Sequence, residues 1–310
     1  MSLKNIGGKE NILFIVGAHK TATSTIVGML NCHPDIFILY ETELNQSLIN
    51  RHGSRFLKQY PDARYLFRHS ENLDSLYSQL QKFLEQKGYF YRYIGSKLPG
   101  LDPQFLETLN EYSVIFNIRD IRTWLCKNTI VKKYETEHDV VPAAIDYCSI
   151  FLQSFRLPRV FHHRMEDLIQ NDQKVISEMG EFLQVDLQCH LKDWWEKIEI
   201  KDKKDPKASN QWWDTHGSSK VRPEKEDTQA EIASHPFWEE LLPIFEKYYH
   251  SKEEPVSISS IEKDLSLLSQ LTRFSPLPLN EAYSRFESVK FGQRRKAEGL
   301  IGKIKKFLKR

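Results

Sequence analysis

The sequence has little net charge, few cysteines and no apolar run long enough to span a bilayer. Its 44 Lys and Arg residues nearly balance its 42 Asp and Glu residues, which gives a formal net charge of +2. This balance argues against a general nucleic-acid-binding protein, because such proteins are normally much more basic. Residues 1–10 lack the apolar core of a signal peptide. We therefore expect a soluble cytoplasmic protein that binds no nucleic acid.

Residue types found in metal and hydrolase sites are present, but without the matching spacing. The four cysteines are Cys32, Cys126, Cys148 and Cys189. Because they are scattered without metal-ligand spacing, we expect reduced thiols in or near the core and no bound metal. The sequence contains no Ser-His-Asp order and no nucleophile elbow. Two neighbouring histidines, His162 and His163, fall on a predicted strand and cannot both face one side of it.

Short apolar runs alternate with helical patterns through the first part of the chain. The runs that predict strands are 12–16, 36–39, 91–96, 114–118 and 160–163. Helices are predicted over 22–32, 44–58, 71–87, 121–134 and 171–184, with a further helix starting at Pro142. This alternation predicts an α/β fold, in which helices cover both faces of a parallel sheet. Ligands of such sheets bind at the carboxyl ends of the strands.

The remaining segments predict one large domain followed by a tail. The hydrophobic content of 40% is enough for a sizeable core. We expect an α/β domain over residues 1–275, with a long polar surface loop before its last helices, and a basic amphipathic helical tail over residues 276–310. One face of the tail would carry Leu300, Ile301, Ile304, Phe307 and Leu308. This helix could lie on anionic lipid, or it could pack as an ordinary terminal helix.

The segment GAHKTATS, residues 17–24, connects the first strand to the first helix and is similar to a phosphate-binding loop. In the nucleotide-triphosphatase pattern G-x-x-x-x-G-K-[ST], Ala22 would stand at the second glycine and Thr23 at the lysine. The lysine is instead Lys20, early in the turn. An anion could still bind the N–H groups at the helix N-terminus and the side chains of Lys20, Thr21, Thr23, Ser24 and Thr25. The alternative is an ordinary strand-turn-helix connection.

The segment HKTATSTIVGMLNCHPDI resembles the 5′-phosphosulfate loop of sulfotransferases that use 3′-phosphoadenosine 5′-phosphosulfate (PAPS), in the form found in carbohydrate (heparan-type) and bacterial members. The resemblance covers roughly the first 190 residues. It implies a P-loop-like α/β fold and sulfuryl transfer without a metal, with 3′-phosphoadenosine 5′-phosphate (PAP) as product. Lys20 would contact the 5′-phosphate and the bridging oxygen as charge develops there. The implied contacts with the donor are His19, Lys20, Thr21, Ala22, Thr23, Ser24 and Thr25.

The segment VIFNIRDIRTWLCKN, residues 114–128, resembles the 3′-phosphate motif of the same family. That motif is a strand followed by Arg-Asp-Pro, with a serine eight residues after the arginine. Arg119 matches the arginine, whereas Ile121 replaces the proline and Lys127 replaces the serine. A lysine can bind phosphate as a charge, so the resemblance implies that Arg119 and Lys127 hold the 3′-phosphate. The alternative for Arg119 is a salt bridge with Asp120 or another acid.

Two further segments resemble acceptor-side elements of the carbohydrate branch. YETEL, residues 40–44, contains an E-x-E pair, in which we favour Glu43 as the base that takes the acceptor's proton, with Glu41 in reserve. The alternative is the acidic start of a helix. GSKLPG, residues 95–100, contains Lys97, which would help to align the acceptor or the sulfonate after the third strand. The alternative is a lysine in an ordinary turn.

The polar segment after residue 200 contains the last candidates. GSSKVRP, residues 217–223, carries Lys220 and Arg222. In the family a late basic loop often closes over the nucleotide, and the alternative here is a solvated loop. His216 is a competing base, and the tryptophans just before it, Trp212 and Trp213, could stack on an acceptor sugar.

Taken together, these patterns predict sulfuryl transfer from PAPS to a hydroxyl group, on a carbohydrate or a glycolipid, by in-line attack with Glu43 as base. The first alternative is a P-loop kinase of a small molecule, which would need ATP and Mg²⁺. Thr23 at the lysine position argues against it. The second alternative is a non-catalytic nucleotide-binding protein. The basic tail leaves peripheral membrane contact open, and the sequence does not decide the oligomeric state.

Overall fold

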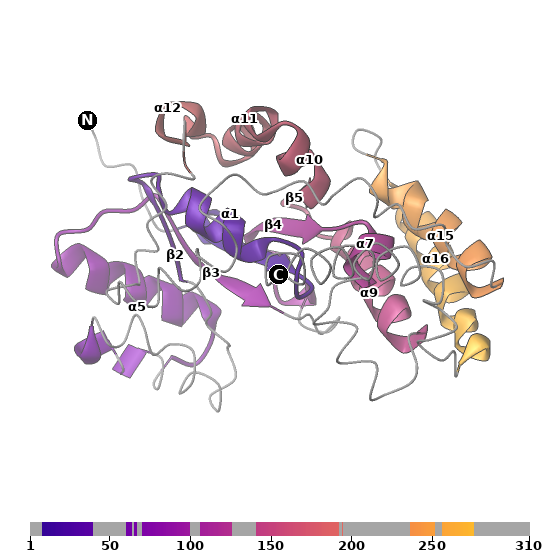
Figure 1. Cartoon of the computed structure of the whole chain (residues 1–310). Coiled ribbons are helices and arrows are strands. Elements are labelled where there is room, and N and C mark those ends of the chain that lie inside the picture. Colours follow the sequence, from indigo (N-terminus) through magenta and orange to yellow (C-terminus); the bar gives the residue numbers. More distant parts are fainter. Residues whose placement is uncertain are drawn as a thin grey trace, which may run out of the picture. The chain divides into compact units, whose positions relative to one another are not determined.

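The computed structural model describes residues 8–39, 60–63, 65–66, 70–99, 106–125, 141–191, 194, 236–251 and 256–275. The chain divides into two compact units (Figure 1). The first comprises residues 1–118 and 153–222, and the second comprises residues 119–152 and 223–310. The predicted helix over 44–58 and the predicted tail over 276–310 lie outside the described residues. The predicted boundary between residues 275 and 276 therefore stays a prediction.

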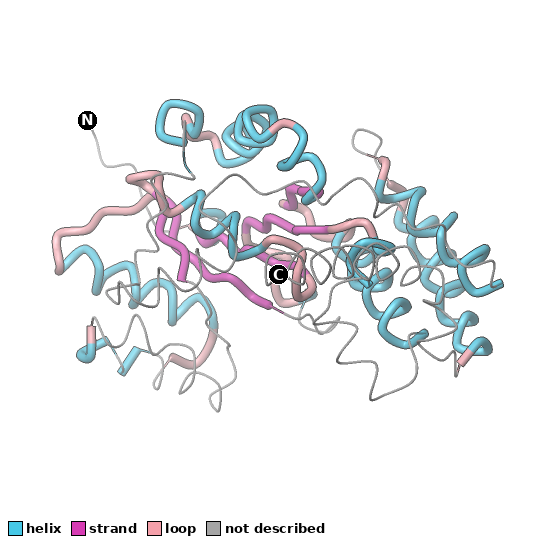
Figure 2. The backbone as a smooth tube through the Cα atoms, viewed as in Figure 1, coloured by secondary structure: helices cyan, strands magenta, loops and turns pink. Residues whose placement is uncertain are grey.

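A five-stranded sheet forms the centre of the first unit (Figure 2). The strands are β1 (Ile12–Gly17), β2 (Ile36–Leu39), β3 (Tyr93–Pro99), β4 (Ser113–Ile118) and β5 (Val160–Arg164). Their order is β2-β3-β1-β4-β5, and every neighbouring pair is parallel. All residues of β1 and β4 are buried, as their continuous apolar runs predict. The α/β fold class predicted from the sequence is confirmed.

Helices cover both faces of this sheet. The helices of the first unit are α1 (Thr23–Leu30), α5 (Leu73–Gln86), α10 (Met165–Gln170), α11 (Asp172–Leu183) and α12 (Leu187–Leu191). Leu13 and Ile15 of β1 pack in the cluster that contains residues of α1, α11 and α12. Phe14, which alternates with them, contacts Tyr77 of α5 with ring centroids 5.4 Å apart. Figure 1 shows α11 and α5 on opposite sides of the sheet.

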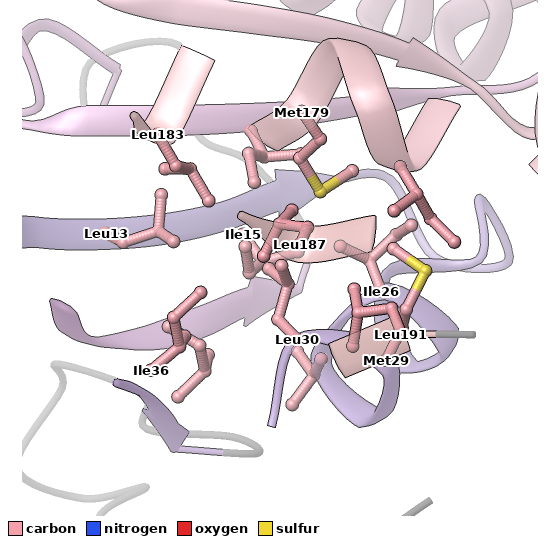
Figure 3. Close-up of a cluster of buried hydrophobic side chains, with 14 of the residues drawn as sticks. Leu13, Ile15, Ile26, Met29, Leu30, Ile36, Met179, Leu183, Leu187 and Leu191 are labelled. Carbon is pink, nitrogen blue, oxygen red and sulfur yellow. The ribbon is translucent and has the colours of Figure 1, made fainter. Parts of the chain in front are cut away.

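The main core cluster lies between the sheet and α1, α11 and α12 (Figure 3). Ile26, Met29 and Leu30 form the apolar side of α1 at helical spacing. On α11 the buried positions include Val175, Ile176, Met179 and Leu183, which the helical pattern predicted. Trp194 belongs to the same cluster. This packing fixes α1, and with it the loop that precedes α1, on one face of the sheet.

The second unit is helical in its described part. Its helices are α7 (Ile121–Leu125), most of α9 (Val141–Ser154), α15 (Pro236–Tyr249) and α16 (Ile258–Gln270). Phe151 of α9 packs against Phe245 of α15 at a centroid distance of 5.7 Å. Lys247 and Tyr248 of α15 both donate to the buried Asp264 carboxylate of α16, at 2.6 and 2.7 Å. Aromatic packing and one charged network therefore join its helices.

Three sequence predictions need correction or completion. The third strand runs to Pro99 and not only to residue 96, so Lys97 lies within β3 and not in a turn. Cys148 is buried and Cys32 partly so, but Cys189 is exposed, because it occupies the solvent side of α12. His162 stacks on the Phe155 ring, and burial lowers its pKa to about 3, so this histidine is neutral.

Among the described helices, none is long and apolar enough to cross a membrane.

Candidate functional site

The loop between β1 and α1 starts at a position that requires glycine. A Cβ atom at Gly17 would lie 2.6 Å from the carbonyl oxygen of Asn117 and 2.6 Å from Oγ1 of Thr21. The loop then places Lys20 and Ala22 in the left-handed region, with φ of 70° and 67°. For residues other than glycine this region costs roughly 1–2 kcal/mol each. Such strain is concentrated at functional sites, so the loop is the first candidate in the described chain.

The loop leaves the N-terminus of α1 without a side-chain cap. Ala22 is the N-cap residue and contributes no capping hydrogen bond from its side chain. The backbone bonds that start the helix run from the N–H groups of Thr25 and Ile26 to the Ala22 carbonyl. The positive end of the helix dipole and the first N–H groups therefore face the loop, an arrangement that binds anions in many proteins.

Lys20 and Thr21, two of the predicted contacts with the donor, differ from each other in exposure and in hydrogen bonding. The Lys20 side chain is exposed, and no described residue forms an ion pair or hydrogen bond with its ammonium group. Thr21 is buried, and its hydroxyl donates to the Ala18 carbonyl at 2.8 Å. Because that proton closes the turn, the Thr21 hydroxyl has a structural role, and the predicted contact of Thr21 with the donor stays a prediction. The exposed side chain of Lys20 is therefore available to an anion.

The other predicted loop residues border the turn. His19 is exposed at the start of the turn, and Ala22 forms its last residue before α1. Thr23 is buried in the first turn of α1, where Ser24 and Thr25 are partly buried. The predicted hydroxyl set is therefore present at the N-terminus of α1, apart from the hydroxyl of Thr21.

A buried lysine from the neighbouring strand contacts the loop's serine. Lys97 of β3 is only 4% exposed, and its Nζ donates to Oγ of Ser24 at 2.9 Å. In a nucleotide-triphosphatase loop, the hydroxyl at the position of Ser24 binds Mg²⁺. Here an ammonium group lies beside that hydroxyl. A buried ammonium group needs hydrogen bonds or charges that compensate its burial, and Ser24 provides one such hydrogen bond. This bond holds the Lys97 ammonium next to the start of α1.

The second predicted anion-binding residue belongs to the second unit. Arg119 follows β4 directly in the chain, is 2% exposed, and donates through Nε to Oγ1 of Thr123 at 2.9 Å. The Tyr147 hydroxyl of α9 accepts from the Arg119 N–H at 2.9 Å and donates to the Arg119 carbonyl at 2.6 Å. The carboxylate of Asp120 pairs with Arg122.

The remaining site predictions lie outside the described residues. They concern Glu41, Glu43, Lys127, His216, Lys220 and Arg222. The sequence analysis did not name Tyr147 and Asn117 as candidates for the site, although the structure draws attention to both. Tyr147 stands among apolar residues of its helix, where a hydroxyl signals a hydrogen-bonding role. Asn117 was read as part of a strand, although an amide within the apolar run VIFNI is itself a signal.

No protein-family model matches the chain, and no curated protein matches it. Three solved structures are similar to it over much of their length. The sulfotransferase domain of a Synechococcus olefin synthase is 16% identical, with a TM-score of 0.41, and the match covers 87% of this chain and 98% of that one.

Two more of the similar structures are also described as sulfotransferases. A sulfotransferase domain from the curacin biosynthetic pathway is 16% identical, with a TM-score of 0.41 and coverage of 84% and 97%. A sulfotransferase from Mycobacterium avium is 11% identical, with a TM-score of 0.37 and coverage of 69% and 79%. Because these identities and TM-scores are low, the function proposed below rests on this chain's own residues.

Proposed function

We propose that the protein is a sulfotransferase that moves a sulfuryl group from PAPS to a hydroxyl acceptor. The observation that supports this most is the contact of the buried Lys97 ammonium with Ser24, in a phosphate-loop-like turn whose own lysine, Lys20, is exposed. A kinase of this loop type would use Mg²⁺ beside the serine hydroxyl. One ammonium group at the start of α1 and a second lysine in the loop before it suit a donor whose phosphate must be stabilised as it leaves.

The proposed reaction is an in-line displacement at sulfur. The acceptor oxygen forms a bond to sulfur while the bond between sulfur and the bridging phosphate oxygen breaks. Lys20 and the N–H groups at the start of α1 stabilise the negative charge that develops on the leaving phosphate. Glu43 takes the acceptor's proton, with Glu41 and His216 as the alternative bases. Ser24, Thr23 and Thr25 hold the remaining oxygens, and Lys97 acts on the same group through its contact with Ser24.

The 3′-phosphate and the acceptor need separate binding groups. Arg119 would hold the 3′-phosphate, and we assign Lys127, Lys220 and Arg222 as further contacts with the nucleotide. The acceptor would be a carbohydrate or a glycolipid, because the segments around Glu43 and Lys97 resemble the carbohydrate branch of the family. A cytoplasmic location and membrane contact through residues 276–310 are also proposed from the sequence.

Calorimetric titration tests the donor directly. The purified protein is titrated with PAP in the absence of magnesium and, separately, with ATP in its presence. We expect PAP to bind, and we expect Lys20→Ala and Arg119→Ala each to weaken binding by at least about 10-fold, since each removes a charge-assisted hydrogen bond. Binding of ATP with magnesium and not of PAP would replace the sulfotransferase proposal with that of a small-molecule kinase.

The hydroxyl of Tyr147 provides a prediction for the second anion-binding residue. In Tyr147→Phe both hydrogen bonds to the Arg119 backbone are lost, while the ring can keep its stacking on Trp124 at 4.2 Å. Because those bonds fix the backbone that carries the arginine, we expect PAP affinity to fall about 10-fold. Tyr93→Phe is the matched control, since it removes one buried hydrogen bond to the Leu183 carbonyl. Equal PAP affinities of the two variants would contradict a positioning role.

A further inference from the structure

Asn117 of β4 is a fully buried amide that the described fold does not use. Neither its Nδ2 nor its Oδ1 forms a hydrogen bond within the described part of the chain, and the residue is 0% exposed. A buried polar group without a partner destabilises a fold, and such groups in native proteins call for an explanation. An apolar side chain would suit this position in the run VIFNI better, if folding were the sole requirement.

Asn31 shows what a structural amide looks like in the same unit. It is also fully buried, and both of its polar atoms are used. Its Nδ2 donates to the Ile38 carbonyl at 2.9 Å, and its Oδ1 accepts from the Ile38 N–H at 2.8 Å. Asn31 thereby ties the end of α1 to β2. The contrast between the two amides indicates that the role of Asn117 lies outside the fold.

The strand register places Asn117 beneath the loop. It pairs with Gly17 of β1 on one side and with His163 of β5 on the other. Paired residues of parallel strands project to the same face, about 4.8 Å apart. The next pair back along the strands, Ile15 and Ile115, belongs to the apolar core on this face. The face therefore changes from apolar to polar where the loop begins.

The loop's inner side chains occupy the space beside Asn117. Oγ1 of Thr21 lies 2.6 Å, and Cγ2 of Thr23 lies 3.1 Å, from the point that a Cβ of Gly17 would occupy. Asn117 is thus one strand spacing away from the side chains that support the N-terminus of α1. Because Lys20 and Ala22 are held in the left-handed region, the loop stores strain that a change of conformation can release.

We propose that Asn117 is a binding residue for the oxyanion that the loop holds, with its Nδ2 group donating to an oxygen of a phosphate or sulfonate. The anion would rest on the N-terminus of α1, between the Lys20 side chain above and the amide below. A neutral amide donates to such an oxygen without a buried charge of its own. Only the identity of the anion rests on the proposed function. Inorganic phosphate would accept the same hydrogen bond from the Asn117 amide.

Two matched leucine variants test this role. Asn117→Leu and Asn31→Leu are each titrated with inorganic phosphate and with PAP, and their thermal unfolding is followed. In Asn117→Leu we expect about 10-fold weaker binding of both ligands and an unfolding temperature equal to or above that of the wild type. In Asn31→Leu we expect a lower unfolding temperature and wild-type affinities, measured well below the transition.

Several outcomes would overturn the role of Asn117. They are wild-type phosphate affinity in Asn117→Leu, a loss of thermal stability equal to that of Asn31→Leu, and a wild-type protein that binds no phosphate. If Asn117→Leu does not fold, the side-chain amide ¹H–¹⁵N signal of Asn117 in the wild type is followed instead, and it must shift when phosphate is added. If phosphate binding depends on Asn117 but PAP does not bind, the inference stands and the sulfotransferase proposal fails.

Discussion

Replacing Lys97 with methionine is expected to lower the affinity for PAP by about 100-fold and to leave the protein folded. Methionine fills nearly the same volume in β3 but removes the ammonium group that donates to Ser24 at 2.9 Å. The charge lies in the protein interior, where its attraction for an anion is screened less than at the surface. The protein should stay folded, because methionine fills nearly the same volume. Calorimetry and thermal unfolding of the same sample measure both effects.

The control for Lys97 is a lysine whose charge is at the surface. Lys174→Met removes an exposed side chain that pairs with Glu178 at 3.6 Å on α11, and such pairs contribute little to stability. It changes the net charge by the same amount, so any general electrostatic effect on PAP binding appears in both variants. If Lys97→Met and Lys174→Met bound PAP equally well, Lys97 would be a structural lysine and the main support for the proposed donor would be lost.

Gly95→Ala is expected to destabilise the fold severely, the largest effect on stability that the structure predicts. Gly95 lies in β3, where it pairs with Leu13 of β1 and with Ile38 of β2. An added Cβ would overlap the Leu13 carbonyl oxygen and would lie 2.6 Å from its carbonyl carbon. Leu13 cannot retreat, because it also pairs with Ser113 of β4. Overpacking of this kind costs about 3 kcal/mol or more, a large part of a typical domain's stability.

The yield of soluble protein and its thermal unfolding, followed by circular dichroism, measure this effect. Gly88→Ala is the matched control. Gly88 follows α5 with φ of 83°, and an added Cβ would meet nothing within 4 Å. Its cost should be confined to backbone strain of about 1 kcal/mol. A Gly95→Ala protein that unfolds at the temperature of the wild type would mean that the β1–β3 register is wrong.

The sequence alone determined the fold class and the approximate place of each strand. Strands buried on both faces are mostly apolar, so the runs at β1, β2 and β4 could be recognised one by one, and the shorter run at β5 fits their alternation with helices. The end of β3 was misjudged for a related reason. In the sequence, Lys97 and the Pro99-Gly100 pair look like the end of a strand. In the structure Lys97 is buried and the strand continues through it to Pro99. A polar residue marks a strand end when it faces water, and the sequence does not show which way it faces.

The loop was also recognisable, because its chemistry is local. Lysine, hydroxyl residues and a helix start occur together in GAHKTATS, and an anion needs these groups close in sequence. What the sequence left open is which of these groups are available. Thr21 uses its hydroxyl proton on Ala18, whereas Lys20 extends into solvent. Both facts depend on backbone conformation, namely on the left-handed residues that shape the turn.

The tertiary structure alone decided the partners that come from distant segments. Lys97 meets Ser24 because β3 lies beside β1, the Tyr147 hydroxyl bridges the Arg119 backbone because α9 packs there, and Asn117 lies below Gly17 because β4 pairs with β1 in that register. Secondary structure follows from the hydrogen bonding and burial of consecutive residues, and so it leaves a periodic pattern in the sequence. Strand order and register are chosen by the packing of the whole sheet, and a shift of one residue would turn Lys97 and Asn117 to its opposite face.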